Sequence, residues 1–131
     1  MQKTNPPTGG KKVGYGIVGC GRVFPVHVKA IKQNQDSELV AVYDINMKAA
    51  KVASTEFGVE AKSSLEELLA DKRVNVITVC TPHHTHKDII LKAIEAGKYC
   101  LSEKPICLNA QEGEAILNSP YYKDNVFVCY Q

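Results

Sequence analysis

Apolar positions along the chain follow two different spacings. Short runs rich in β-branched residues predict strands at residues 13–18, 39–43, 74–80, 99–102 and 126–130. Longer stretches, in which apolar positions recur at helical spacing, lie between them and predict helices from Gly21 to about Asn34 and over residues 46–57, 64–70, 85–97 and 109–118. Residues 74–80 are almost wholly apolar, which is typical of a strand buried on both faces.

Local signals support several of these helix ends. Gly58 follows the helix at 46–57, where a left-handed residue commonly ends a helix. Ser64 with Glu67, and Thr85 with Asp88, match the capping box that opens a helix. Strands that alternate with helices of this length predict βαβ units with right-handed crossovers. We therefore expect a doubly wound α/β domain with a parallel sheet and helices on both faces.

Composition and charge narrow the function. The 131 residues fit one domain, and 16 Lys+Arg against 14 Asp+Glu leave a net charge of +2. Nucleic-acid modules and polybasic membrane binders need a concentrated positive face, so neither partner is expected. Residues 1–12 have no apolar core of a signal peptide and are expected to be a flexible leader to a domain at 13–131. Five cysteines without a CxxC pair predict reduced thiols and a cytoplasmic location.

The turn after the first strand contains Gly19 and Gly21. In a dinucleotide-binding turn, Gly19 would allow the sharp bend and Gly21 would let a pyrophosphate approach the helix N-terminus. The third position of that pattern is Phe24 rather than Gly or Ala, which predicts looser packing of the helix. An ordinary strand-to-helix turn would also use glycine. Arg22 would lie beside a phosphate or would simply be a surface residue.

Asp44 strengthens the nucleotide interpretation. It ends the second predicted strand, about 20 residues beyond the glycine turn, where an acidic residue accepts hydrogen bonds from the ribose hydroxyls. A carboxylate there repels a 2′-phosphate, so NAD is favoured over NADP. The alternative is a turn residue or the N-cap of the next helix.

Two later loops, at residues 81–86 and 101–105, follow predicted strands and should lie at the same edge of the sheet. The loop at 81–86 contains three histidines, but no Cys, Asp or Glu is placed to complete a metal site there, and no metal is expected. His83 and His84 are expected to be solvated or to cap the helix, whereas His86 could point into the crevice. Lys104 in the second loop could donate a hydrogen bond to a substrate hydroxyl. Alternatively, Glu103 and Lys104 lie in a solvated turn, where Glu103 keeps Lys104 charged. From these residues alone, the solvated turn is favoured.

Together these segments resemble a known family. The residues are GIVGCGRV with His27 beyond it, LVAVYDIN, the run VCTPHHTHKDIILKAIEAGKYCLSEKP, and VFVCYQ at the end. They are similar to the N-terminal domain of the glucose-fructose oxidoreductase, inositol dehydrogenase and MocA-like (Gfo/Idh/MocA) family. The resemblance implies a Rossmann NAD(P)-binding domain of an enzyme that transfers hydride to or from sugars, cyclitols or nucleotide sugars.

The resemblance also implies roles for individual residues. Lys104 would contact the hydroxyl whose carbon loses hydride, and its bond to Pro105 is a candidate cis peptide. Lys104 and His86 are therefore the expected catalytic residues. The expected cofactor contacts are Gly19, Gly21, Arg22, Val23, Asp44, Thr81, Pro82, His83, Glu103 and Lys104.

Family members also carry a larger substrate domain, which this chain is expected to lack. The resemblance therefore implies NAD binding with little turnover, a polyol, sugar or nucleotide-sugar substrate bound through the missing domain, and a homo-oligomeric full-length protein. Two alternatives are a non-catalytic nucleotide-binding or regulatory module and a methyltransferase with the same glycine turn. The EKP segment, Glu103 to Pro105, has no evident use in either.

Overall fold

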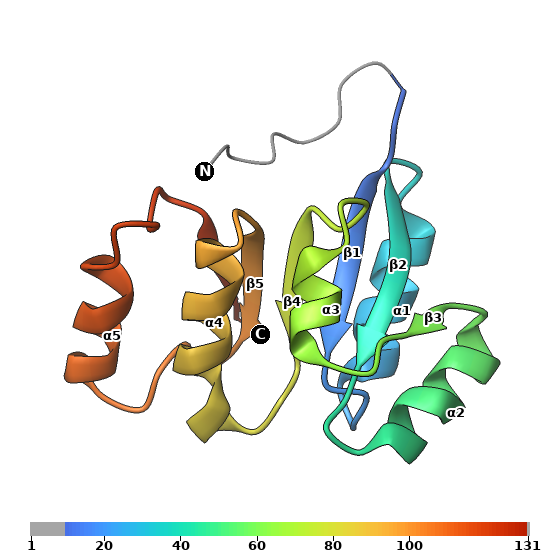
Figure 1. Cartoon of the computed structure of the whole chain (residues 1–131), viewed down its shortest axis with the longest axis horizontal. Coiled ribbons are helices and arrows are strands. Elements are labelled where there is room, and N and C mark those ends of the chain that lie inside the picture. Colours follow the sequence, from blue (N-terminus) through green and yellow to red (C-terminus); the bar gives the residue numbers. More distant parts are fainter. Residues whose placement is uncertain (1–9, 131) are drawn as a thin grey trace.

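A parallel sheet of six strands forms the centre of the structure, a computed structural model that describes residues 10–130. The strand order is β3-β2-β1-β4-β5-β6, as expected for a Rossmann fold (Figure 1). The strands are β1 (Val13–Val18), β2 (Ser37–Tyr43), β3 (Glu60–Ala61), β4 (Val76–Val79), β5 (Tyr99–Glu103) and β6 (Val126–Cys129). The helices are α1 (Phe24–Gln33), α2 (Met47–Phe57), α3 (Leu65–Ala70), α4 (His86–Glu95) and α5 (Ala110–Leu117), with a 3₁₀ turn at His83–Thr85.

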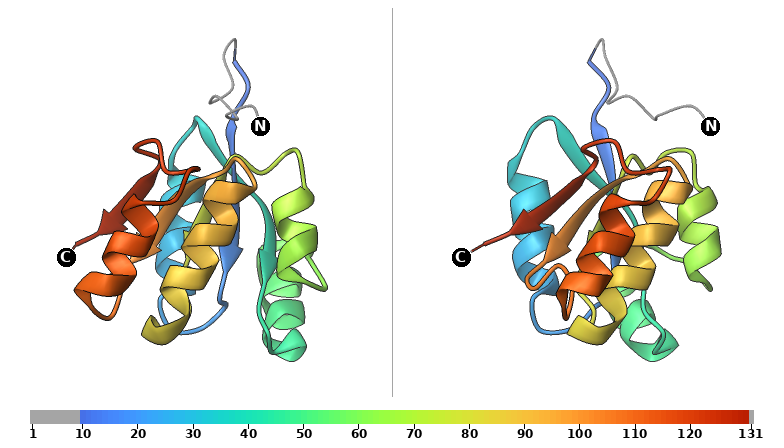
Figure 2. Two further views of the ribbon diagram at one scale, coloured as in Figure 1. Left: turned by 60° about the vertical axis from the view of Figure 1, so that its left-hand side comes forward. Right: turned by 90° about the vertical axis from the view of Figure 1, so that its left-hand side faces the viewer.

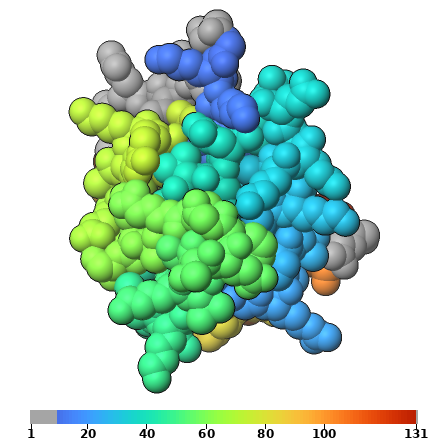
Figure 3. Space-filling view, turned by 90° about the vertical axis from the view of Figure 1, so that its right-hand side faces the viewer, coloured from blue at the N-terminus to red at the C-terminus, as the bar shows by residue number. Residues whose placement is uncertain are grey.

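Helices cover both faces of the sheet, so the predicted fold class is confirmed. α1 and α2 lie on one face, and α3, α4 and α5 lie on the other (Figures 1 and 2). Alternate strand residues supply two cores: Ile17 packs with α1 and α2, whereas Val18 packs with α3 and α4. Figure 3 looks onto the β3 edge, where the chain between α2 and α3 covers the end of the sheet.

Helix ends follow the local signals except at Thr85. Gly58 ends α2 with a φ of 67°, and Ser64 Oγ accepts a hydrogen bond from the Glu67 amide at 3.1 Å, as predicted. The capping box at Thr85 is wrong, because its hydroxyl makes no cap bond to α4. Thr85 Oγ1 instead lies 2.6 Å from the Pro82 carbonyl oxygen, which closes the 3₁₀ turn before α4 begins at His86.

The structure differs from the sequence-based predictions at two further places. The edge strand β3 was not predicted, because a strand of two residues is too short to show a hydrophobic pattern. The looser packing expected at Phe24 is also wrong, because this ring is 2% exposed and meets Phe57 of α2 edge to face, with ring centroids 5.4 Å apart. A large side chain here fills the space between α1 and α2.

Several sequence expectations concern the chain as a whole. The proposed leader falls largely on residues 1–9, which lie outside the described residues, and residues 10–12 belong to no helix or strand. All five cysteines are free thiols. Across residues 10–130, the structure has no helix with both the length and the apolar character needed to cross a bilayer.

A network of charges joins the turn between α3 and β4, at the amino ends of the strands, to Lys62, which follows β3. Asp71 follows α3, and its largely buried carboxylate accepts hydrogen bonds from the Arg73 guanidinium at 2.6 Å and from its amide at 2.9 Å. Lys62 Nζ lies 3.1 Å from the same carboxylate. The bonds from Arg73 hold the pKa of Asp71 well below its usual range, with a smaller contribution from Lys62.

This network predicts a pH-dependent stability. The Asp71 carboxyl has a lower pKa folded than unfolded, so its contribution is present at neutral pH and is lost as the pH falls below about 4. Asp71→Asn should lower the free energy of unfolding at pH 7 by about 1–3 kcal/mol and flatten its dependence on pH in acid. Asp36→Asn, at the same edge but exposed, is the matched control. Urea unfolding of Asp71→Asn that matches the wild type between pH 7 and pH 3 would contradict this account.

Candidate cofactor-binding site

The carboxyl ends of β1, β4 and β5 surround one cavity. The strand order reverses between β1 and β4, and ligands of open α/β sheets bind in the crevice at this switch point. The cavity has a volume of about 420 Å³. Its lining contains every predicted cofactor residue except Gly19 and Asp44, and consists of Gly21, Arg22, Val23, Cys80, Thr81, Pro82, His83, His86, Glu103 and Lys104.

The two turn glycines have different surroundings. Gly19 has a φ of +98°, and a Cβ built on it would lie 2.6 Å from the Cys80 carbonyl oxygen, so the contact with β4 leaves no room for a side chain. A Cβ built on Gly21 would meet nothing within 4 Å. Gly19 is thus required by the packing of the turn, whereas the backbone at Gly21 is open to a ligand.

The N-terminus of α1 is directed at this open space. α1 begins at Phe24, and no hydrogen bond to another described residue engages the backbone N–H groups of Arg22 and Val23. Free amides and the positive end of the helix dipole favour an anion at this position. The open backbone at Gly21 and these donors fit the pyrophosphate of a dinucleotide.

Asp44 connects the end of β2 to the glycine turn. One carboxylate oxygen accepts a hydrogen bond from the Cys20 amide and the other from the Asn46 amide, both at 2.8 Å. The N-cap of α2 is Asn46, so the N-cap alternative for Asp44 is wrong, and its carboxylate holds the glycine turn against the start of α2. Burial raises the pKa of the Cys20 thiol to about 12, with a smaller contribution from the Asp44 charge, so this thiol is protonated at neutral pH.

His86 is fully buried beneath the cavity. Its Nδ1 lies 2.6 Å from the Pro105 carbonyl oxygen and its Nε2 lies 2.8 Å from the Thr81 carbonyl oxygen. The ring therefore connects the loop after β4 to the turn after β5. Its neighbour His83 is exposed and packs edge to face against it, with ring centroids 5.8 Å apart.

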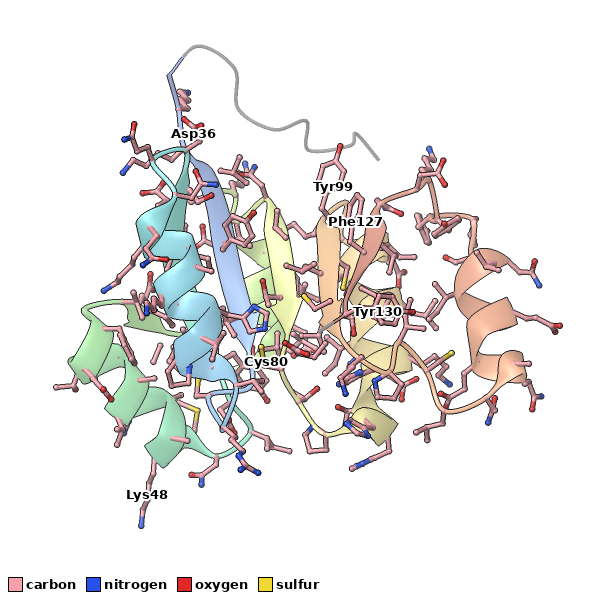
Figure 4. The ribbon with its side chains drawn as sticks, turned by 180° about the vertical axis from the view of Figure 1, so that it is seen from behind. Asp36, Lys48, Cys80, Tyr99, Phe127 and Tyr130 are labelled. Atoms are coloured by element: carbon pink, nitrogen blue, oxygen red, sulfur yellow. The ribbon has the colours of Figure 1, made fainter. Side chains whose placement is uncertain are left out.

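The segment after β5 presents Lys104 at the cavity. Lys104 is exposed, and its bond to Pro105 is cis, as predicted. Glu103 does not hold Lys104, because its carboxylate bonds to His27 Nε2 of α1 at 2.7 Å. Local sequence patterns did not predict this partner, since the two residues are 76 positions apart. Cys80 was also not predicted as part of the cavity lining, and Figure 4 places it beside the first turns of α1.

Comparison with known proteins agrees with this geometry. The model of an oxidoreductase family with an NAD-binding Rossmann fold, Gfo/Idh/MocA, matches residues 13–130. An inositol 2-dehydrogenase of Rhizobium meliloti is 37% identical over 105 residues, which make up 80% of this chain and 32% of the relative. The chain thus spans about a third of the length of this relative.

Solved structures show the same domain with cofactor bound. The WlbA dehydrogenase of Bordetella pertussis, in complex with NADH and UDP-GlcNAcA, is 30% identical with a TM-score of 0.85, over 94% of this chain and 36% of that one. The myo-inositol dehydrogenase of Lactobacillus casei, in complex with NAD(H) and myo-inositol, is 25% identical with a TM-score of 0.81, over 89% and 36%. From its sequence match and its fold, the chain belongs to the Gfo/Idh/MocA oxidoreductase family and is its NAD-binding Rossmann domain.

Proposed function

We propose that this chain binds NAD for an enzyme that transfers hydride between the nicotinamide and the carbinol carbon of a polyol, sugar or nucleotide sugar. The observation that supports this most directly is the single cavity that joins Gly21, Thr81 and Lys104. The names of the relatives, which act on inositol or bind UDP-GlcNAcA, support the substrate class. A cytoplasmic location and a homo-oligomeric longer protein remain proposals.

Each side of the cavity would hold a different part of the dinucleotide. The amides of Arg22 and Val23 would bind the pyrophosphate above Gly21, and Asp44, which lies outside the cavity lining at the end of β2, would accept hydrogen bonds from the ribose hydroxyls. Thr81, Pro82 and His83 would flank the nicotinamide side together with Glu103. Bound here, the nicotinamide would supply the hydride chemistry.

Lys104 would act on the substrate. Its exposed ammonium can donate a hydrogen bond to the reacting hydroxyl and stabilise negative charge on that oxygen as its proton leaves. We propose that a general base comes from the part of a longer polypeptide that this chain does not include. His86 is fully buried and bonds to the carbonyls of Thr81 and Pro105, so we propose that it positions Lys104 and does not touch the substrate.

Calorimetry should detect one NAD per chain, with NADP bound more weakly. Asp44→Asn removes the charge that favours ribose hydroxyls over a 2′-phosphate, and should weaken NAD binding by about tenfold and reduce the preference for NAD over NADP. Asp36→Asn, at the opposite end of the sheet, should bind as the wild type does. No binding of NAD, or tighter binding of NADP, would show the proposal to be wrong.

The two glycines provide a matched pair of variants. Gly21→Val places its Cβ where no atom lies within 4 Å, so it should weaken NAD binding more than about tenfold while the unfolding midpoint stays close to that of the wild type. Gly19→Ala forces a Cβ against the Cys80 carbonyl at a positive φ, so it should lower stability by about 2 kcal/mol or more. Thermal unfolding and NAD titration of both variants test the assignment. Equal effects on stability would contradict it.

The isolated chain should turn over little substrate. With NAD and myo-inositol, we expect no NADH formation above the rate without protein, followed by absorbance of the reduced nicotinamide. Robust dehydrogenase activity of residues 1–131 would show that the base and the substrate contacts are already present in this chain.

A further inference from the structure

Three side chains that could bind a metal ion come from distant parts of the chain and lie close together at the carboxyl ends of β5 and β6. His27 lies on α1, Glu103 ends β5 and Cys129 ends β6. The candidate ligand atoms, one from each residue, all lie within 4.8 Å of one another. It is the one grouping of this kind that the structure contains between residues 10 and 130.

The sheet register explains the convergence. Glu103 and Cys129 are paired residues of two neighbouring parallel strands, so their side chains project from the same face. The same face carries Tyr99 and Phe127, which Figure 4 shows side by side. α1 covers the neighbouring strands on this face and directs His27 towards Glu103, with 2.7 Å between His27 Nε2 and Glu103 Oε1.

The chemistry of these three side chains and the distances between their ligand atoms fit a borderline-soft divalent cation. Imidazole nitrogen, carboxylate oxygen and thiolate sulfur all bind Zn²⁺, at about 2.0–2.3 Å in a tetrahedron, which places ligand atoms roughly 3.3–3.8 Å apart. The present separations, from 2.7 Å to at most 4.8 Å, bracket that range, so movements of about 1 Å would complete the site. A thiolate and a carboxylate together balance the charge of a divalent cation.

We propose that His27, Glu103 and Cys129 form a site for a borderline-soft divalent cation such as Zn²⁺, with a fourth position open to water. The side chains of His27 and Glu103 are 12% and 17% exposed, so an ion can enter without unfolding of the domain. This inference does not depend on NAD binding.

Binding exchanges protons and involves no oxidation. The Cys129 thiol loses its proton to the solvent and becomes the sulfur ligand, and the hydrogen bond between His27 and Glu103 breaks. The Nε2 proton that His27 donates to Glu103 also leaves, to the solvent from an imidazolium or to Nδ1 from a neutral ring, so that the Nε2 lone pair binds the ion while Nδ1 carries a proton.

Metal titration of the reduced, metal-free chain tests the site. The wild type should bind one equivalent of Zn²⁺, and Co²⁺ should give a thiolate-to-cobalt charge-transfer absorption. Cys129→Ser should abolish that absorption, and both Cys129→Ser and His27→Gln should weaken Zn²⁺ binding at least about tenfold, because even outer partners of metal ligands contribute 10–100-fold.

Two control variants exclude other sites. Cys107→Ser removes a half-buried thiol from another part of the chain, and His84→Gln removes an exposed histidine of the loop after β4, so both should bind Zn²⁺ as the wild type does. Circular dichroism confirms that each variant is folded. The proposal is overturned if the wild type binds no Zn²⁺, or if binding survives both Cys129→Ser and His27→Gln.

Discussion

The close contact between the glycine turn and β4 organises the edge of the sheet that carries the site. Gly19 donates a hydrogen bond to the Tyr43 carbonyl at 2.8 Å, and Cys80 donates one to the Val18 carbonyl at 2.8 Å. The turn is thus bonded to the end of β2 while β4 bonds to the end of β1. Only glycine permits this approach, because a Cβ at Gly19 would collide with the Cys80 carbonyl. The contact places Gly21, Arg22 and Val23 beside Cys80 and Thr81 on one side of the cavity.

Side-chain hydrogen bonds connect the segments at this edge of the sheet in addition to the backbone contact. Asp44 bonds the glycine turn to the start of α2, and His86 bonds the loop after β4 to the Pro105 turn. His27 bonds α1 to the end of β5 through Glu103. These three residues join the segments around the site by bonds within the chain, and such bonds favour a preorganised site.

Much of the fold could be predicted from the sequence because its signals are local. The apolar run at 74–80, Gly58 and Ser64 act within a few residues, and the distance from the glycine turn to Asp44 reflects one βαβ unit. Local sequence signals gave wrong predictions where contacts with residues outside the local segment determine the structure. Thr85 matches a cap pattern, but its hydroxyl closes a turn with Thr81 and Pro82 instead.

The parts of the site that were missed depend on contacts between residues far apart in the sequence. The partner of His27 follows from how α1 crosses the sheet, and Cys129 meets Glu103 through the register of β5 and β6. Neither contact can be predicted from the spacing of neighbouring residues in the sequence. His86 is fully buried at the start of α4, and its two carbonyl neighbours come from both loops. The resemblance implies that these loops lie at the cofactor, and the structure shows that His86 joins them to each other.

The most direct test of the account is to map NAD binding onto individual residues by nuclear magnetic resonance. Titration of the isotope-labelled chain with NAD should shift the amide signals of Gly21, Arg22, Thr81 and Lys104, which line the cavity at the carboxyl ends of the strands. The amides of Asp36 and Arg73, at the opposite edge, should stay unchanged. An absence of shifts, or shifts confined to the edge that contains Asp36 and Arg73, would contradict the assignment of this cavity to the cofactor.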